Sequence, residues 1–287
     1  MGRMGAEDPP LVASAEPPTF GPLVDAAWLH QHLDDPDLRV IDFRWYLQGR
    51  DGPTEYAKAH IPGAVFVDLE EVTGRGHGRH PLPTSRQFEA AMRKAGVSRS
   101  TRVVVYDDAG ASVAARLWFL LGYFGHDAQA VLDGGIGAWG RPLETAAPSV
   151  ERGDFRAASP DERRVLHFED VRALRGVPLI DARASERYRG EREPVDPKAG
   201  HIPGALNAPF TENVGPDGRF KPAAELRARY EELGAAHGAV FYCGSGVNAS
   251  QHLLAMAVAG LANARLYAGS WSDWSNRDAP VATGAEP

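Results

Sequence analysis

Long apolar runs are absent from this sequence, and cysteine is almost absent. No apolar stretch approaches the roughly 18 residues that a membrane-spanning helix needs, so a membrane is not an expected partner. The formal net charge is −7 and no block of about five like charges occurs, which argues against a nucleic-acid partner. The single cysteine, Cys243, excludes an internal disulfide and a cysteine-based metal site. It is therefore either an inert buried thiol or a reactive one.

The N-terminal segment lacks a basic stretch followed by an apolar core, which is the pattern of a secretory signal. A cytoplasmic location is therefore the expectation. Residues 1–20 are rich in proline and glutamate and are predicted to form a disordered tail.

What the sequence does contain is a long internal repeat. The pentapeptide His-Ile-Pro-Gly-Ala occupies residues 60–64 and recurs unchanged at residues 201–205. In both places a short apolar segment that ends in Asp-x-Arg precedes it, with the aspartates at Asp42 and Asp181. Matches in the same order, roughly 140 residues apart, predict a duplicated domain. We expect both aspartates to be structural and to bind backbone amides near their own loops.

The chain of 287 residues is long enough for two domains, each with its own core. We place the first at residues 21–145 and the second at 165–287, joined by a linker at 146–164 that lacks clear periodicity. Apolar strands alternate with helical segments, such as those at residues 112–121 and 249–261. This pattern predicts an α/β fold of two tandem domains, each a mostly parallel sheet flanked by helices.

Cys243 lies between a predicted buried strand and a predicted helix that starts near Asn248. The glycine-rich loop between them lets several backbone N–H groups point at one atom, at the positive end of a helix dipole. Such a cradle should stabilise a thiolate or the outer sulfur of a persulfide. A phosphatase with this loop would need an arginine six residues after the cysteine, where Ala249 stands. Sulfur transfer remains open, and so does an inert thiol.

The repeated pentapeptide, the Asp-x-Arg segments and the presence of Asp107 where the second half has Cys243 resemble the tandem-domain rhodanese family. The likeness runs from about residue 23 to residue 279. The family comprises thiosulfate and 3-mercaptopyruvate sulfurtransferases. The resemblance implies a first domain without catalytic cysteine and a second domain with it. The active site would lie between them, a Cys243 persulfide would carry the sulfur by double displacement, and no metal or organic cofactor would be needed.

Within that family, basic residues after the cysteine accompany thiosulfate as donor, whereas a neutral Cys-Gly-Ser-Gly-Val-Thr loop accompanies mercaptopyruvate. The loop here reads Cys-Gly-Ser-Gly-Val-Asn, so the resemblance favours mercaptopyruvate, with Asn248 as a departure and thiosulfate as the alternative. Arg187 matches the arginine that binds the donor's anionic group. A second arginine is expected some nine residues later, but residues 193–196 contain none. Arg192 could replace it, although a surface charge is the preferred interpretation there and at Arg189.

The resemblance also assigns proton handling to Ser245, for which a turn-capping role is an equal alternative. It pairs that serine with His60 and Asp51, although scaffolding is the preferred interpretation of the pentapeptide. Trp45 and Tyr46 match a segment that lines the cleft, with core packing as the alternative. The full set of predicted binding residues is Arg187, Gly244, Gly246, Val247, Asn248, Trp45 and Tyr46.

The implied partners are a small-molecule sulfur donor and an acceptor that is a small thiol, reduced thioredoxin or cyanide. The rival hypothesis is a non-enzymatic rhodanese-like module that binds another protein. A reactive cysteine in a glycine-rich loop argues against that rival.

Overall fold

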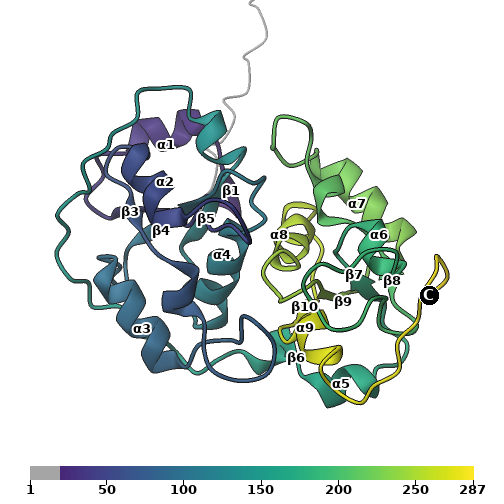
Figure 1. Ribbon diagram of the computed structural model, residues 1–287. Coiled ribbons are helices and arrows are strands. Elements are labelled where there is room, and N and C mark those ends of the chain that lie inside the picture. Colours follow the sequence, from purple (N-terminus) through teal and green to yellow (C-terminus); the bar gives the residue numbers. More distant parts are fainter. Residues whose placement is uncertain (1–19) are drawn as a thin grey trace, which may run out of the picture.

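The computed structural model describes residues 20–287, and the tail predicted at residues 1–20 lies outside this range except for its last residue. Two domains stand side by side (Figure 1). The first contains β1 (Leu23–Val24), α1 (Ala26–His32), β2 (Leu38–Asp42), α2 (Gly52–Lys58), β3 (Val65–Phe66), η1 (Leu69–Val72), α3 (Ser85–Lys94), β4 (Arg102–Tyr106), α4 (Ala114–Tyr123), β5 (Gln129–Leu132) and η2 (Gly135–Ala138).

The second domain repeats this order with shorter helices. It contains η3 (Glu162–Arg164), β6 (Val165–Leu166), α5 (Phe168–Arg172), β7 (Leu179–Asp181), α6 (Ser185–Tyr188), β8 (Leu206–Asn207), η4 (Phe210–Asn213), α7 (Ala223–Glu232), β9 (Ala239–Tyr242), α8 (Ser250–Val258), β10 (Ala264–Tyr267) and α9 (Ser270–Trp274). The helices predicted at residues 112–121 and 249–261 are α4 and α8.

Each domain is built on a parallel five-stranded sheet. The strand order is β1-β5-β4-β2-β3 in the first and β6-β10-β9-β7-β8 in the second, so the two sheets have the same topology. The central strands β4 and β9 are buried and rich in β-branched and aromatic residues, as expected for a sheet covered on both faces. The predicted fold class and the duplication are confirmed. The carboxyl ends of β4 and β9 carry Asp107 and Cys243, respectively.

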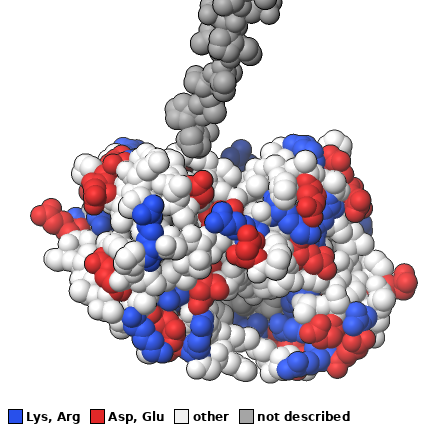
Figure 2. Space-filling model, turned by 90° about the horizontal axis from the view of Figure 1, so that it is seen from above, with Lys and Arg blue, Asp and Glu red and all other residues white. Residues whose placement is uncertain are grey.

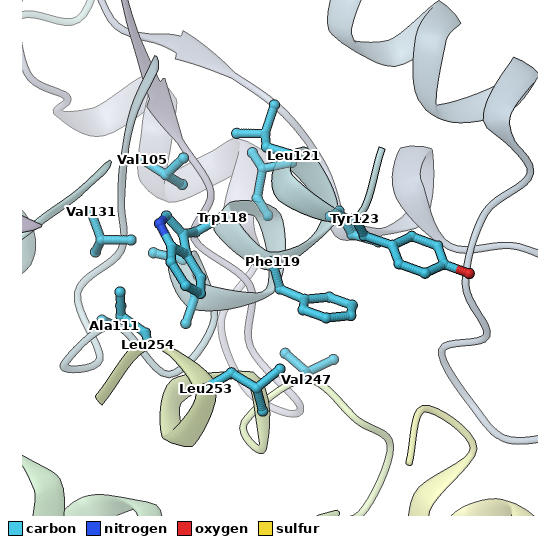
Figure 3. Packing of buried hydrophobic residues seen from close by; sticks show 14 of the residues in the cluster. Val105, Ala111, Trp118, Phe119, Leu121, Tyr123, Val131, Val247, Leu253 and Leu254 are labelled. Atoms are coloured by element: carbon cyan, nitrogen blue, oxygen red, sulfur yellow. The ribbon is translucent and has the colours of Figure 1, made fainter. Parts of the chain in front are cut away.

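Helices α4 and α8 pack against each other between the domains, near the middle of Figure 1. Their apolar side chains belong to one buried cluster that spans both domains. Figure 3 shows Val247 and Leu253 of the second domain beside Phe119 and Trp118 of the first. This shared core fixes the loop that follows β9 against the first domain.

The Asp-x-Arg segments are a structural device that the duplication repeats. Asp42 accepts from the Arg44 amide and pairs with its guanidinium at 2.6 Å. Asp181 and Arg183 do the same, also at 2.6 Å. All four side chains are buried, where an unpaired charge would be costly. The structural role predicted for the two aspartates is therefore confirmed.

Acidic and basic side chains are interspersed over the face of the molecule shown in Figure 2. No field of one sign covers that face, so attraction of a charged small molecule has to come from local groups. Across residues 20–287, no helix is both long and apolar enough to cross a membrane.

Candidate active site

Cys243 lies at the end of β9 and is only 2% exposed. Its Sγ accepts a hydrogen bond from the Gly246 amide at 3.2 Å. Gly246 has a φ of +78°, and a Cβ there would lie 2.5 Å from the carbonyl oxygen of Ala268. Glycine is therefore required to turn this amide toward the sulfur. The predicted loop does aim a backbone N–H group at the cysteine, but within residues 20–287 one such group donates to the sulfur where several were expected.

A buried cation from the other domain lies against the same loop. Arg116 on α4 is 1% exposed and donates to the carbonyl oxygens of Gly246 at 3.4 Å and His80 at 3.0 Å. Its Nε has no hydrogen-bond partner among residues 20–287. Burial lowers the pKa of Arg116 to about 10, and the negative charge of Cys243 opposes that shift. A guanidinium at this pKa is still charged at neutral pH, so a thiolate at Cys243 would compensate it.

Ser245 is contacted by a histidine from the first domain. The His80 Nδ1 atom lies 2.8 Å from the Ser245 Oγ atom, and both side chains are buried. Burial lowers the pKa of His80 to about 4, aided by the charges of Arg116 and Arg79. The imidazole is therefore neutral at pH 7 and able to exchange a proton with the hydroxyl. The Glu70 carboxylate stands 4.0 Å from the other ring nitrogen.

The structure does not place His60 and Asp51 beside Ser245, where the resemblance had suggested them. His60 binds the carbonyl oxygens of Tyr56 and Ala146 through its two ring nitrogens. Asp51 is the N-cap of α2 and accepts from Thr54. Both contacts match the scaffolding interpretation that the repeated pentapeptide favoured. The histidine beside Ser245 is His80 and not the His60 that the resemblance suggested.

Arg187 on α6 lies close to Gly244 of the cysteine loop, but it already has partners. It pairs with Glu193 at 2.7 Å and with Asp196 at 3.4 Å. Burial would raise the pKa of Glu193, but hydrogen bonds from Arg187 and from backbone amides outweigh it and lower the pKa. Arg192 is exposed, in agreement with the preferred prediction of a surface charge.

A second arginine, Arg79, does reach the site, although it was not among the predicted residues. A Cβ placed on Gly244 would lie 2.7 Å from the Arg79 Nη2 atom and 3.6 Å from the Arg187 Nη1 atom. The two guanidinium groups therefore converge beside the residue that follows Cys243.

The other predicted site residues are placed around this centre. Trp45 meets the His80 ring edge-on, with 5.0 Å between the ring centres. Tyr46 instead donates to Asp108 at 2.8 Å and so belongs to the loop after β4. Val247 is buried in the core shared by the domains, and the Asn248 side chain donates across the interface to the Ser112 carbonyl at 3.2 Å.

Arg79, His80 and Arg116 were not among the predicted site residues. A signal for two of them was present, since Gly-Arg-His at residues 78–80 corresponds to Gly-Arg-Phe at 218–220. For Arg116, only the packing of α4 on α8 brings the guanidinium to the cysteine loop. Across residues 20–287, no group of three or more His, Cys, Asp or Glu side chains is arranged to hold a metal ion.

Comparisons with known proteins agree with this architecture. The model of the rhodanese-like domain matches residues 25–141 and 167–277. A probable 3-mercaptopyruvate sulfurtransferase of Pseudomonas aeruginosa is 43% identical, covering 91% of this chain and 98% of its own. A putative thiosulfate sulfurtransferase, SseB of Mycobacterium tuberculosis, is 41% identical, covering 88% and 94%. The crystal structure of SseA from Escherichia coli, a 3-mercaptopyruvate enzyme, superposes with a TM-score of 0.79 and 36% identity, covering 88% of this chain and 99% of its own.

Proposed function

The chain belongs to the rhodanese-like family as a sulfurtransferase with two copies of the domain, and from that premise we propose that Cys243 carries the sulfur as a persulfide taken from 3-mercaptopyruvate. The observation that carries this proposal is the placement of the Cys243 sulfur. It accepts the Gly246 N–H group, and the buried Arg116, which has no carboxylate partner within residues 20–287, donates to the carbonyl oxygen of the same Gly246. The hydrogen bond and the nearby positive charge both favour a negative sulfur.

The first half of the reaction is an attack by the Cys243 thiolate on the thiol sulfur of the donor. A bond forms between the two sulfur atoms while the donor's carbon–sulfur bond breaks, and its electron pair stays with carbon as the enolate of pyruvate. The sulfur now carried on Cys243 is the outer atom of a persulfide. In the second half an acceptor, either a small thiol, reduced thioredoxin or cyanide in the cytoplasm, attacks that outer sulfur and restores the thiolate.

The pyruvate enolate needs a proton, and Ser245 is the group that we assign to deliver it. Its hydroxyl lies two residues after the nucleophile and 2.8 Å from the neutral His80 ring. A neutral imidazole can donate from one nitrogen and accept at the other, so it can return a proton to the serine after the transfer. The role proposed here for His80 replaces the one predicted for His60.

Arg187 is the residue that we assign to the donor carboxylate, because a planar guanidinium binds two carboxylate oxygens at once. A second candidate donor is thiosulfate. Its support is the 41% identity to a relative described as a putative thiosulfate sulfurtransferase. Thiosulfate releases sulfite, which leaves without a proton, so this donor would make no use of Ser245.

The test is mass spectrometry of the intact chain after incubation with each donor, without an acceptor. We expect a gain of about 32 Da on Cys243, reversed by cyanide, since a persulfide adds one sulfur atom. The Cys243→Ser variant should gain nothing and should lose sulfur transfer altogether. Sulfur transfer that survives in this variant would refute the covalent path. Steady-state rates with both donors then rank them, and a higher kcat/KM for thiosulfate would reverse our order.

A further inference from the structure

Cys243 is 2% exposed, so a donor must have a route to it. A cavity of about 680 Å³ lies next to the cysteine loop, at the junction of the two domains. It is lined by residues 76–79 of the first domain and by residues 195–197 together with Ser272, Asp273, Asn276 and Arg277 of the second. Ser272 connects this cavity to the loop, because its amide donates to the Gly244 carbonyl at 2.8 Å.

Arg79 stands between this cavity and the cysteine loop. Its amide donates to the Ser272 hydroxyl at 3.0 Å, which ties the first domain to α9. Its guanidinium extends toward the cysteine loop. The Nη2 atom lies only 2.7 Å from the position that a Cβ on Gly244 would occupy. Its Nε is buried and has no hydrogen-bond partner among residues 20–287. This N–H group therefore lacks an acceptor, which a ligand oxygen that reached it would supply.

The Arg79 guanidinium is held by Asp196, which spans the domain junction to reach it. The Asp196 side chain is 2% exposed, and burial raises its pKa even though Arg79 and Arg187 both oppose that change. A carboxylate in such a place is stabilised only as long as it is paired. An incoming carboxylate that took over Arg79 would replace one ion pair of this arginine with another, while Asp196 would keep its pair with Arg187 at 3.4 Å. This exchange requires an anionic ligand, since a neutral one offers nothing in place of Asp196.

The geometry points to Arg79 and Asp196 as an anion-selective gate over Cys243. A small anionic donor enters through the cavity, displaces Asp196 from Arg79 and comes to rest between Arg79 and Arg187, beside the sulfur. Arg79 is thereby a specificity-determining residue of the first domain. The inference rests on the proposed function for the identity of the donor, but the gate itself can be measured without sulfur transfer.

The second domain supplies a matched control. Arg219 occupies the position in Gly-Arg-Phe that Arg79 occupies in Gly-Arg-His. Its side chain is 44% exposed, and it pairs with the exposed Asp217 at 3.7 Å. The arginine at this position is therefore not tied to a buried acid by the fold itself. Arg219→Gln removes the same charge without touching the proposed gate.

The experiment compares alkylation of Cys243 by iodoacetate, which is anionic, and by iodoacetamide, which is neutral, in the whole protein. In Arg79→Gln we expect the iodoacetamide rate to rise about fivefold, because the gate is open, while the preference for iodoacetate over iodoacetamide falls about tenfold. In Asp196→Asn both reagents should react faster and the preference should persist. Arg219→Gln should match the unmodified chain. With 3-mercaptopyruvate, Arg79→Gln should raise KM more than it lowers kcat.

Unchanged alkylation rates in both gate variants would overturn the inference. If Arg79→Gln does not fold, Asp196→Asn decides alone, because loss of one buried charge must still release Arg79. The inference would also be overturned if Arg79→Gln reacted faster with both reagents to the same extent and its KM were unchanged. The arginine would then block access to Cys243 without selecting for anions. Absence of the persulfide mass gain on Cys243, with the alkylation pattern intact, would instead count against the proposed function alone.

Discussion

The loops after β4 and β9 occupy the same place in the two domains, yet they hold their anions differently. The Asp107 carboxylate accepts four backbone N–H groups, from residues 109, 111, 113 and 114, at 2.8–2.9 Å. Burial raises the pKa of Asp107, and these four amides oppose it. Within residues 20–287, the Cys243 sulfur accepts one hydrogen bond, from the Gly246 amide. The carboxylate with four donors is saturated, whereas the sulfur is not.

The two loops also differ in the side chain of the other domain that binds an equivalent glycine carbonyl. Gly110 and Gly246 both stand three residues after the anion of their own loop. The carbonyl oxygen of Gly110 accepts from the neutral Gln251 of α8 at 2.6 Å, whereas that of Gly246 accepts from the charged Arg116 of α4 at 3.4 Å. The saturated carboxylate receives a neutral group and the unsaturated sulfur receives a cation. The domain without cysteine thus places a charged side chain against the cysteine loop.

The largest effect is expected for Arg116→Gln. This change gives the Gly246 carbonyl a neutral glutamine as its partner, as Gly110 already has in Gln251. We expect sulfur transfer at neutral pH to fall by about 100-fold, because a buried cation stabilises an adjacent anion by a few kcal/mol at most. The midpoint of the pH dependence of Cys243 alkylation should rise by about one to two pH units.

The control for that variant is Arg102→Gln, which removes a paired arginine at the start of β4. It should leave the alkylation profile unchanged. An Arg116→Gln variant that folds, is less active and yet keeps the original alkylation midpoint would show that Arg116 only braces the loop. Restoration of the profile in Arg116→Lys would support the charge as the cause.

A smaller effect is expected when Ser245 of the cysteine loop is changed to the alanine that the loop after β4 has. Ser245 corresponds to Ala109, since each lies two residues after its anion. In Ser245→Ala, kcat with 3-mercaptopyruvate should fall by about 10- to 100-fold, because a proton donor to the leaving enolate is lost. The rate with thiosulfate should hardly change, since sulfite needs no proton. Steady-state kinetics with both donors measure the difference, and equal losses with the two donors would assign Ser245 to the loop structure instead.

The repeat made much of this predictable. The two mostly parallel sheets and the equivalence of Asp107 and Cys243 follow from the order of matching segments, because alternating strands and helices form parallel α/β domains, whereas the order of the strands within each sheet was not predicted. The loop chemistry at Cys243 was predictable for the same reason, since it is local. What could not be read was the contribution of Arg116 and His80, because contacts across a domain junction depend on how α4 and α8 pack rather than on sequence spacing.

The smallest effect expected is on stability, and it separates His80 from its counterpart Phe220. The pKa of His80 is about 4, below the ordinary value of 6.5, because the ring is buried beside Arg116 and Arg79. Between these two pH values the unfolded chain binds a proton that the folded chain does not. Stability therefore falls as the pH drops from about 6.5 to about 4, by up to about 3 kcal/mol from this residue.

His80→Phe removes this proton linkage and introduces the phenylalanine that the second domain has at the equivalent position, Phe220. Its free energy of unfolding, measured by urea denaturation, should fall less steeply between pH 6.5 and pH 4 than that of the unmodified chain. The exposed His237, changed to Phe, should leave the slope as it was. A slope in His80→Phe equal to that of the unmodified chain would mean that folding does not lower the pKa of His80. The ring beside Ser245 would then titrate near 6.5, and part of it would be an imidazolium just below neutral pH, contrary to a relay that is neutral throughout.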